Sequence, residues 1–141
     1  MKNRTKLKMV LCLLTLFLLC FASGCSDKDQ NEEPAVESVD ITLSIDYPKS
    51  SNRTDIREVP FKLEENTTVL QLIEVYGNVN NLPVLVDTTH ATLEGINGVQ
   101  NGILWKNGTW KFKINGKYTS KAENEQVLAH EDFVEFIYVK K

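Results

Sequence analysis

Cysteine is scarce in this sequence and absent from most of it. The chain has 141 residues and three cysteines, Cys12, Cys20 and Cys25, and none follows Cys25. The first two lie in an apolar run, residues 9–22, that is typical of a secretory signal. If that segment is removed, Cys25 is the only thiol left, which excludes disulfides and thiolate metal sites. We therefore expect a hydrophobic core alone to hold the fold, as it can in one domain of about 100 residues.

Catalytic signatures are also missing. There is no Gly-x-Ser-x-Gly, Ser-x-x-Lys or glycine-rich phosphate loop, and the acidic residues form no recognisable dyad. The only histidines are His90 and His130. His130 with Glu131 and Asp132 could bind a divalent cation or reach a cobalt ion, but no spacing of three or four metal donors accompanies them. We interpret both histidines as surface residues and expect no enzyme, no metal site and no cofactor.

The first 24 residues have the pattern of a lipoprotein signal peptide. After a basic start, the 14 residues from Met9 to Ala22 are nearly all apolar, too few to span a bilayer comfortably. The residues Ala22-Ser23-Gly24 before Cys25 resemble a bacterial lipobox, although Leu is usual where Ala22 stands. The resemblance implies cleavage after Gly24 and acylation of Cys25, which would anchor the chain in the membrane. An ordinary signal peptide with an incidental cysteine is the alternative.

Cleavage would make the chain strongly acidic. The sequence has 16 basic and 19 acidic residues, and removing residues 1–24 takes away four basic residues and no acidic ones, leaving a net charge of −7. This charge argues against nucleic acid as a partner. Residues 25–38 are the lipidated cysteine and a polar, acidic stretch that we interpret as a disordered tether. We expect the protein to be lipid-anchored at the extracytoplasmic face of the cell membrane, with the bilayer as its partner through Cys25.

Residues 39–141 have the pattern of one folded domain that begins with two strands. Apolar and polar residues alternate over 39–45 and again over 59–63. Pro60 lacks a backbone donor, so we expect the second strand at a sheet edge. Residues 82–86 are apolar at nearly every position, which is consistent with a strand or a buried loop, and residues 88–95 could pair back on them.

A short helix is predicted between these strands. Thr68 and Gln71 fit a capping box, and Gly77 is expected to end the helix. The expected apolar face consists of Val69, Leu72, Ile73 and Tyr76.

The densest folding signal begins at Trp110. Apolar residues at 110, 112 and 114 alternate with Lys111 and Lys113, which we interpret as the solvated face of a strand. Asn115-Gly116 predicts a tight hairpin turn. Farther on, Val127 and Leu128 are expected to point inward, and residues 133–139, apolar on both faces, to form a central strand. The fold class is α+β: a β-grasp-like mixed sheet with one short helix packed on it, preceded by the signal peptide and tether.

Several motifs are spread over residues 39–139. They are Thr67-Thr68-Val69-Leu70, Ile96-Asn97-Gly98-Val99, Trp110 with Ile114-Asn115-Gly116, and Asp132, Val134, Phe136 and Tyr138. Together these motifs resemble a known family, the bacterial transcobalamin-C-terminal-like domains of small surface proteins. Glu131 stands where that family usually has glycine.

The resemblance implies a cobalamin-related function. In the animal carriers a helical barrel covers one side of the corrin and this small domain the other, so the chain would hold half a site. It also implies an accessory role in an energy-coupling-factor cobalamin transporter. Candidate ligand-binding residues are Trp105, Trp110 and Tyr118, because exposed aromatic rings can lie against a planar ligand. For each the alternative is packing: Trp110 in the core, Tyr118 across its hairpin. A protein-interaction or adhesion module without a small ligand is the competing function.

Overall fold

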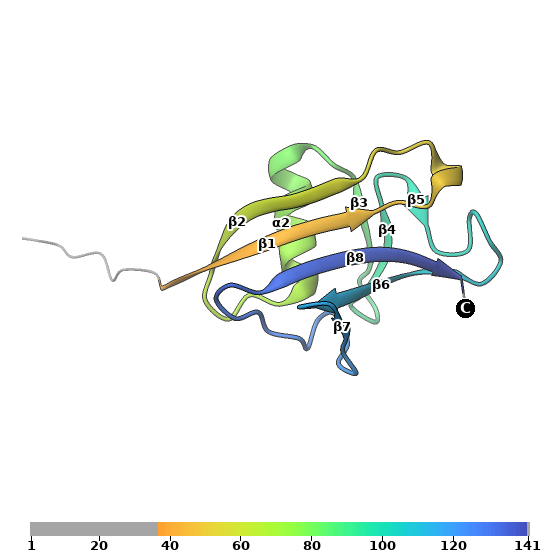
Figure 1. Cartoon of the computed structure of the whole chain (residues 1–141). Helices are drawn as coiled ribbons and strands as arrows, with labels where there is room; N and C mark the ends of the chain where they lie inside the picture. The colour runs from red at the N-terminus through yellow and green to blue at the C-terminus, as the bar shows by residue number, and fades with distance from the viewer. Residues whose placement is uncertain (1–36, 141) are drawn as a thin grey trace, which may run out of the picture. The chain divides into compact units, whose positions relative to one another are not determined.

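A computed structural model describes residues 37–140 of the chain, which belong to one compact unit (Figure 1). The predictions for the signal peptide, for Cys25 and for most of the tether lie outside the described residues.

The described residues form two sheets and one α-helix, and this confirms the α+β class. The first sheet has five strands in the order β2-β1-β8-β6-β7, and the second has three in the order β3-β4-β5. The elements are β1 (Ser38–Asp46), a 3-10 turn η2 (Lys49–Ser51), β2 (Ile56–Glu64), α2 (Val69–Asn80), β3 (Val84–Asp87), β4 (Thr92–Ile96), β5 (Val99–Gln100), β6 (Gly108–Ile114), β7 (Lys117–Tyr118) and β8 (Phe133–Lys140).

Strand β8 is the central strand of the larger sheet, as predicted. It runs parallel to β1 and antiparallel to β6, which makes the sheet mixed. Val134 and Phe136 lie on the sheet face that is turned toward helix α2, and both are fully buried. Phe133 and Ile137 lie on the opposite face and are partly exposed. The helix lies behind this sheet in Figure 1, so the core sits between the two layers.

Strand β2 lies at the edge of the sheet, as Pro60 predicted. Pro60 pairs with Thr42, whose own N–H donates to the other side, to the Asp132 carbonyl at 2.9 Å. The missing proline donor therefore costs the ladder no hydrogen bond. A bulge interrupts β2 near Glu58, which has a φ of 50° and donates its N–H to the Ser44 hydroxyl at 2.9 Å.

Helix α2 begins as predicted and ends later than predicted. The Thr68 hydroxyl accepts from the Gln71 N–H, and the Gln71 side chain accepts from the Thr68 N–H, so the capping box is confirmed. Gly77 does not end the helix, which continues to Asn80 with Asn81 as its left-handed cap. Gly77 is needed for close approach instead, since a Cβ there would lie 2.6 Å from Cγ2 of Val84.

Val127 and Leu128 were both expected to point inward, and only Leu128 does. Leu128 is buried, whereas Val127 is 46% exposed and the prediction for it was wrong. Val127 forms an antiparallel bridge with Thr68, and adjacent residues in extended backbone point to opposite sides.

Candidate functional site

Trp110 belongs to the core. Its indole is 2% exposed, and its Nε1 donates to the Val99 carbonyl oxygen at 2.7 Å. The Tyr47 ring meets it edge-on, with centroids 5.6 Å apart. The alternation that predicted a core position is confirmed, and in this structure the enclosed ring offers no face to a ligand.

Trp105 packs beside the same core. Its ring is partly buried, with its centroid 5.5 Å from that of Tyr138, and the Tyr138 ring is 5.4 Å from Trp110. Tyr138 also donates its hydroxyl to the Gln100 carbonyl at 3.0 Å. A Cβ at Gly108 would overlap the Tyr138 ring, which explains why glycine stands there. The two tryptophans are thus joined through Tyr138, and Trp105 keeps only part of its surface accessible.

Tyr118 lies apart from both tryptophans. It pairs with Lys113 near the hairpin turn, whereas Trp110 lies nearer the start of β6. Its ring is 59% exposed, and Nζ of Lys113 is 5.2 Å from the ring centroid. The structure therefore does not bring the three candidate aromatic residues together, and their ligand contacts stay predictions.

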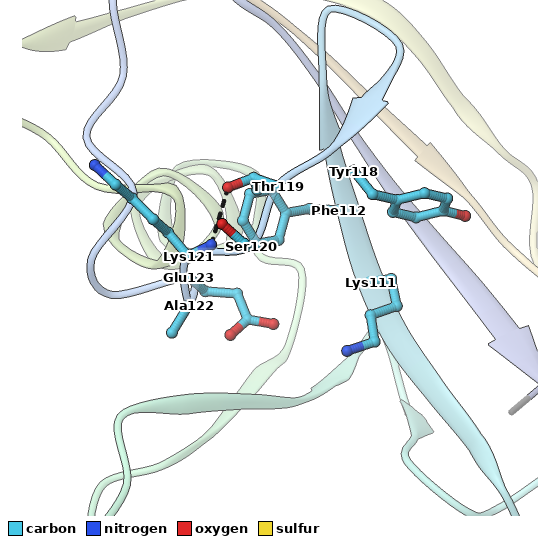
Figure 2. A pocket seen from close by; sticks show the side chains of 8 residues that line it. All are labelled: Lys111, Phe112, Tyr118, Thr119, Ser120, Lys121, Ala122 and Glu123. Carbon is cyan, nitrogen blue, oxygen red and sulfur yellow. Dashed lines mark hydrogen bonds between the residues drawn. The ribbon is translucent and has the colours of Figure 1, made fainter.

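Residues of β6, of β7 and of the loop that follows β7 line an open hollow in the surface, with a volume of about 540 Å³. Figure 2 shows β6 on one side of it and the loop after β7 on the other. The Phe112 ring points from β6 toward the loop, and the Tyr118 ring points to the opposite side of the strand. The lining residues are Lys111, Phe112, Tyr118, Thr119, Ser120, Lys121, Ala122 and Glu123.

The hollow exists because β7 is short. It pairs only with Lys113 and Ile114, so the rest of β6 has no neighbouring strand on that side. Alternate residues of an antiparallel strand direct both backbone groups to one side. For Trp110 that side faces away from β8, since its N–H donates to Oδ1 of Asn101 at 2.8 Å. Phe112, two positions on, directs its N–H and C=O the same way, toward the β7 side of the strand.

The loop that forms the facing wall is fixed to the start of helix α2. The N–H groups of Val69 and Leu70 have no partner within the helix, and they donate to the carbonyls of Gln126 and Glu123, each at 2.9 Å. The Thr119 hydroxyl donates to the Gln126 side chain at 3.0 Å. The wall is therefore held by hydrogen bonds at both ends, and Glu123 projects from an anchored backbone.

Lys111 and Glu123 give the hollow two opposite charges on facing walls. In Figure 2 their charged ends are turned toward the space between β6 and the loop. Neither takes part in an ion pair within 4.0 Å in the part of the chain that the structure describes. The sequence interpretation of Lys111 as part of a solvated strand face missed this arrangement. No local pattern connects Lys111 with Glu123, because the hairpin and the helix start bring them together.

Each histidine is exposed and contacts one aspartate. Nδ1 of His90 is 2.6 Å from a carboxylate oxygen of Asp87, and this contact lowers the Asp87 pKa below its usual range. Nδ1 of His130 accepts the N–H of Asp40 at 3.2 Å. Within residues 37–140 no group of three or more His, Cys, Asp or Glu side chains could hold a metal ion. The same residues contain no helix long and apolar enough to cross a membrane.

No family profile and no curated protein matches the chain by sequence. Among solved structures it is similar to haptocorrin in complex with Cbi, with a TM-score of 0.60 and 12% identity over 74% of this chain. It spans about a quarter, 26%, of that haptocorrin chain. A protein from Ruminococcus gnavus ATCC 29149, provisionally described as metal-binding, is also similar, with a TM-score of 0.51 and 13% identity over 73% of this chain and 98% of that one. The chain thus shares a fold with part of haptocorrin, and the likeness to transcobalamin-like domains is a distant one of fold alone.

Proposed function

We propose that this chain is a surface lipoprotein that binds a corrinoid and acts as an accessory component of a corrinoid transporter. The observation that carries the proposal is the fold shared with haptocorrin in complex with Cbi, at a TM-score of 0.60 over 74% of this chain. The lipobox-like residues before Cys25 support the membrane anchor.

The hollow beside β6 is the surface best suited to such a ligand. Its volume of about 540 Å³ lies within the range of small-molecule sites, roughly 300–1,000 Å³. Most of the residues that line it are polar, Phe112 is only 6% exposed, and the interior position of Trp110 leaves no room for a ligand. A domain that covers one side of a corrin should bind it weakly, with a Kd on the order of micromolar.

Calorimetric titration of residues 26–141 with cobalamin and with cobinamide tests the binding step. All of the described core lies within this fragment. We expect a measurable Kd for at least one corrinoid, weakened by Lys111→Gln and unchanged by Lys62→Gln on the far edge strand. Trp105→Ala and Tyr118→Ala test the two remaining aromatic candidates. The absence of heat at millimolar ligand would remove the corrinoid proposal.

The anchor and the transport role are tested in cells. Cys25→Ser should leave an uncleaved precursor or a protein without lipid, because the acyl chains are attached to that sulfur. Uptake of labelled cobinamide at limiting concentration should fall when the gene is deleted and recover with the unaltered chain. Recovery to the same level with Cys25→Ser would contradict the anchored role.

The competing function, a protein-interaction module, would use a free sheet edge. Strand β2 is the long edge strand of the larger sheet. Pro60 and the bulge at Glu58 interrupt that edge, and both features disfavour the addition of a further strand. These features favour the corrinoid proposal over strand addition at β2.

A further inference from the structure

We infer that the hollow beside β6 selects primary carboxamide groups, so that the protein binds corrinoids whose peripheral arms are amides in preference to corrinoids whose arms are free acids. This inference rests on the proposed corrinoid binding and names the ligand group that the site recognises.

The charges on the two walls carry the inference. A lysine ammonium only donates hydrogen bonds, and an ionised glutamate only accepts them. Lys111 and Glu123 line the same hollow with their charged ends turned toward the space between them, and neither is in an ion pair among residues 37–140 (Figure 2). A primary carboxamide matches both walls at once, since its carbonyl oxygen accepts from Lys111 and its NH₂ group donates to Glu123.

Other charge states match only one wall. A carboxylate would be attracted by Lys111 and repelled by Glu123. The free-energy cost of removing its hydration water would therefore not be offset by hydrogen bonds to both walls. An ammonium group would meet the reverse problem. The pair of walls therefore selects a neutral group that both donates and accepts.

A carboxamide arm that enters the hollow would lie between Lys111 on β6 and Glu123 on the loop after β7. An arm of the corrinoid would enter the hollow, and the macrocycle would remain outside it.

The hydrogen bonds that anchor the loop after β7 also fix the position of Glu123 opposite β6. The Glu123 carbonyl accepts the Leu70 N–H at 2.9 Å, and the Ala122 carbonyl accepts the Gln126 N–H at 3.0 Å. Glu123 is thereby fixed at the first turn of α2, facing a strand of the sheet. Glu125 belongs to the same turn, is exposed and does not line the hollow, so it offers a matched control.

The experiment compares two ligands and two variants. The full chain in detergent micelles is titrated calorimetrically with cobinamide, which has amide arms, and with cobyrinic acid, which has carboxylates. We expect cobinamide to bind at least about tenfold more tightly, since a hydrogen bond to a charged group is worth roughly that factor. Glu123→Gln should abolish the preference because a glutamine NH₂ can donate to a carboxylate. Glu125→Gln makes the same change of charge in the same turn and should keep the preference.

Each result decides between the two proposals. Equal affinity of the unaltered protein for both ligands would overturn the carboxamide inference and leave corrinoid binding in place. An equal loss of preference in Glu123→Gln and Glu125→Gln would also overturn it, because overall negative charge would then explain the discrimination. Absence of binding by either ligand, with native circular dichroism, would remove the corrinoid proposal and this inference with it.

Discussion

The Asn115 side chain joins the hairpin turn to the start of the central strand through Asp132. Its Nδ2 donates to the Asp132 carboxylate at 2.9 Å, and its Oδ1 accepts the Phe133 N–H at 2.8 Å. The other carboxylate oxygen of Asp132 accepts the Ala129 N–H at 2.8 Å. Asn115 also donates its backbone N–H to the Phe133 carbonyl at 2.8 Å. Two of the motifs that suggested the family resemblance are thus one structural unit.

Asn115→Ala should destabilise the domain. Asn115 and Gly116 have φ values of 52° and 77°, so the predicted tight turn is confirmed, and alanine would lose both the left-handed preference and the two side-chain hydrogen bonds. We expect a loss of about 1–3 kcal/mol in the free energy of unfolding, measured by urea denaturation. Asn124→Ala, in an exposed turn, is the control. Equal stabilities for the two variants would contradict the role of the Asn115–Asp132 contact.

Glu131→Gly should stabilise the domain. Glu131 has a φ of 66°, and it occupies the position where the resembling family usually has glycine. Glycine adopts this left-handed conformation without the Cβ penalty, which outweighs its larger chain entropy in the unfolded state. We expect a gain on the order of 0.5–1 kcal/mol by urea denaturation.

The control for this change is Glu94→Gly. Glu94 lies inside strand β4, where the backbone is extended and glycine has no steric advantage, so this variant should lose stability. Equal shifts in the two variants would show that backbone conformation at 131 does not set the outcome.

The strands could be predicted from the sequence because their apolar residues report directly on one buried face. The alternation around Trp110 and the apolar run after Phe133 correctly predicted a core position and a central strand. The capping box at Thr68 was equally visible because it depends on residues three positions apart.

The features that the sequence did not predict depend on contacts between distant segments. Gly77 has the pattern of a helix end, yet its role is to admit Val84 from the next strand. The hollow depends on where β7 ends and on how the following loop contacts α2. No local sequence pattern therefore connects Lys111 with Glu123. Local patterns report the burial of a face, and they do not report which surface residues later face each other.

Gly77→Ala should destabilise the domain even though alanine is the better helix former. Helix propensity alone predicts a gain of about 1 kcal/mol for this change. The new Cβ would lie 2.6 Å from Cγ2 of Val84 and 2.7 Å from the Leu82 carbonyl oxygen, so helix and strand would have to separate. We expect a net loss of about 1–3 kcal/mol by thermal and urea denaturation. Val84→Ala, which removes Cγ2, should partly rescue Gly77→Ala, and a stabilised single variant would contradict the close contact.

The stability of the domain should decline between pH 10 and pH 12 because of Tyr47. Burial raises the pKa of Tyr47 from 10.0 to about 12, and its ring is 7% exposed against Trp110. In this pH window the unfolded chain releases the phenolic proton and the folded chain keeps it, so the folded state binds more protons. The free energy of unfolding therefore keeps its full value below this pH window and falls as the pH rises through it. Tyr47→Phe removes the titrating group and should flatten this part of the pH profile. Denaturation curves at intervals of half a pH unit measure the slopes, and identical slopes for the Tyr47→Phe variant and the unaltered protein would show that the buried phenol does not control alkaline unfolding.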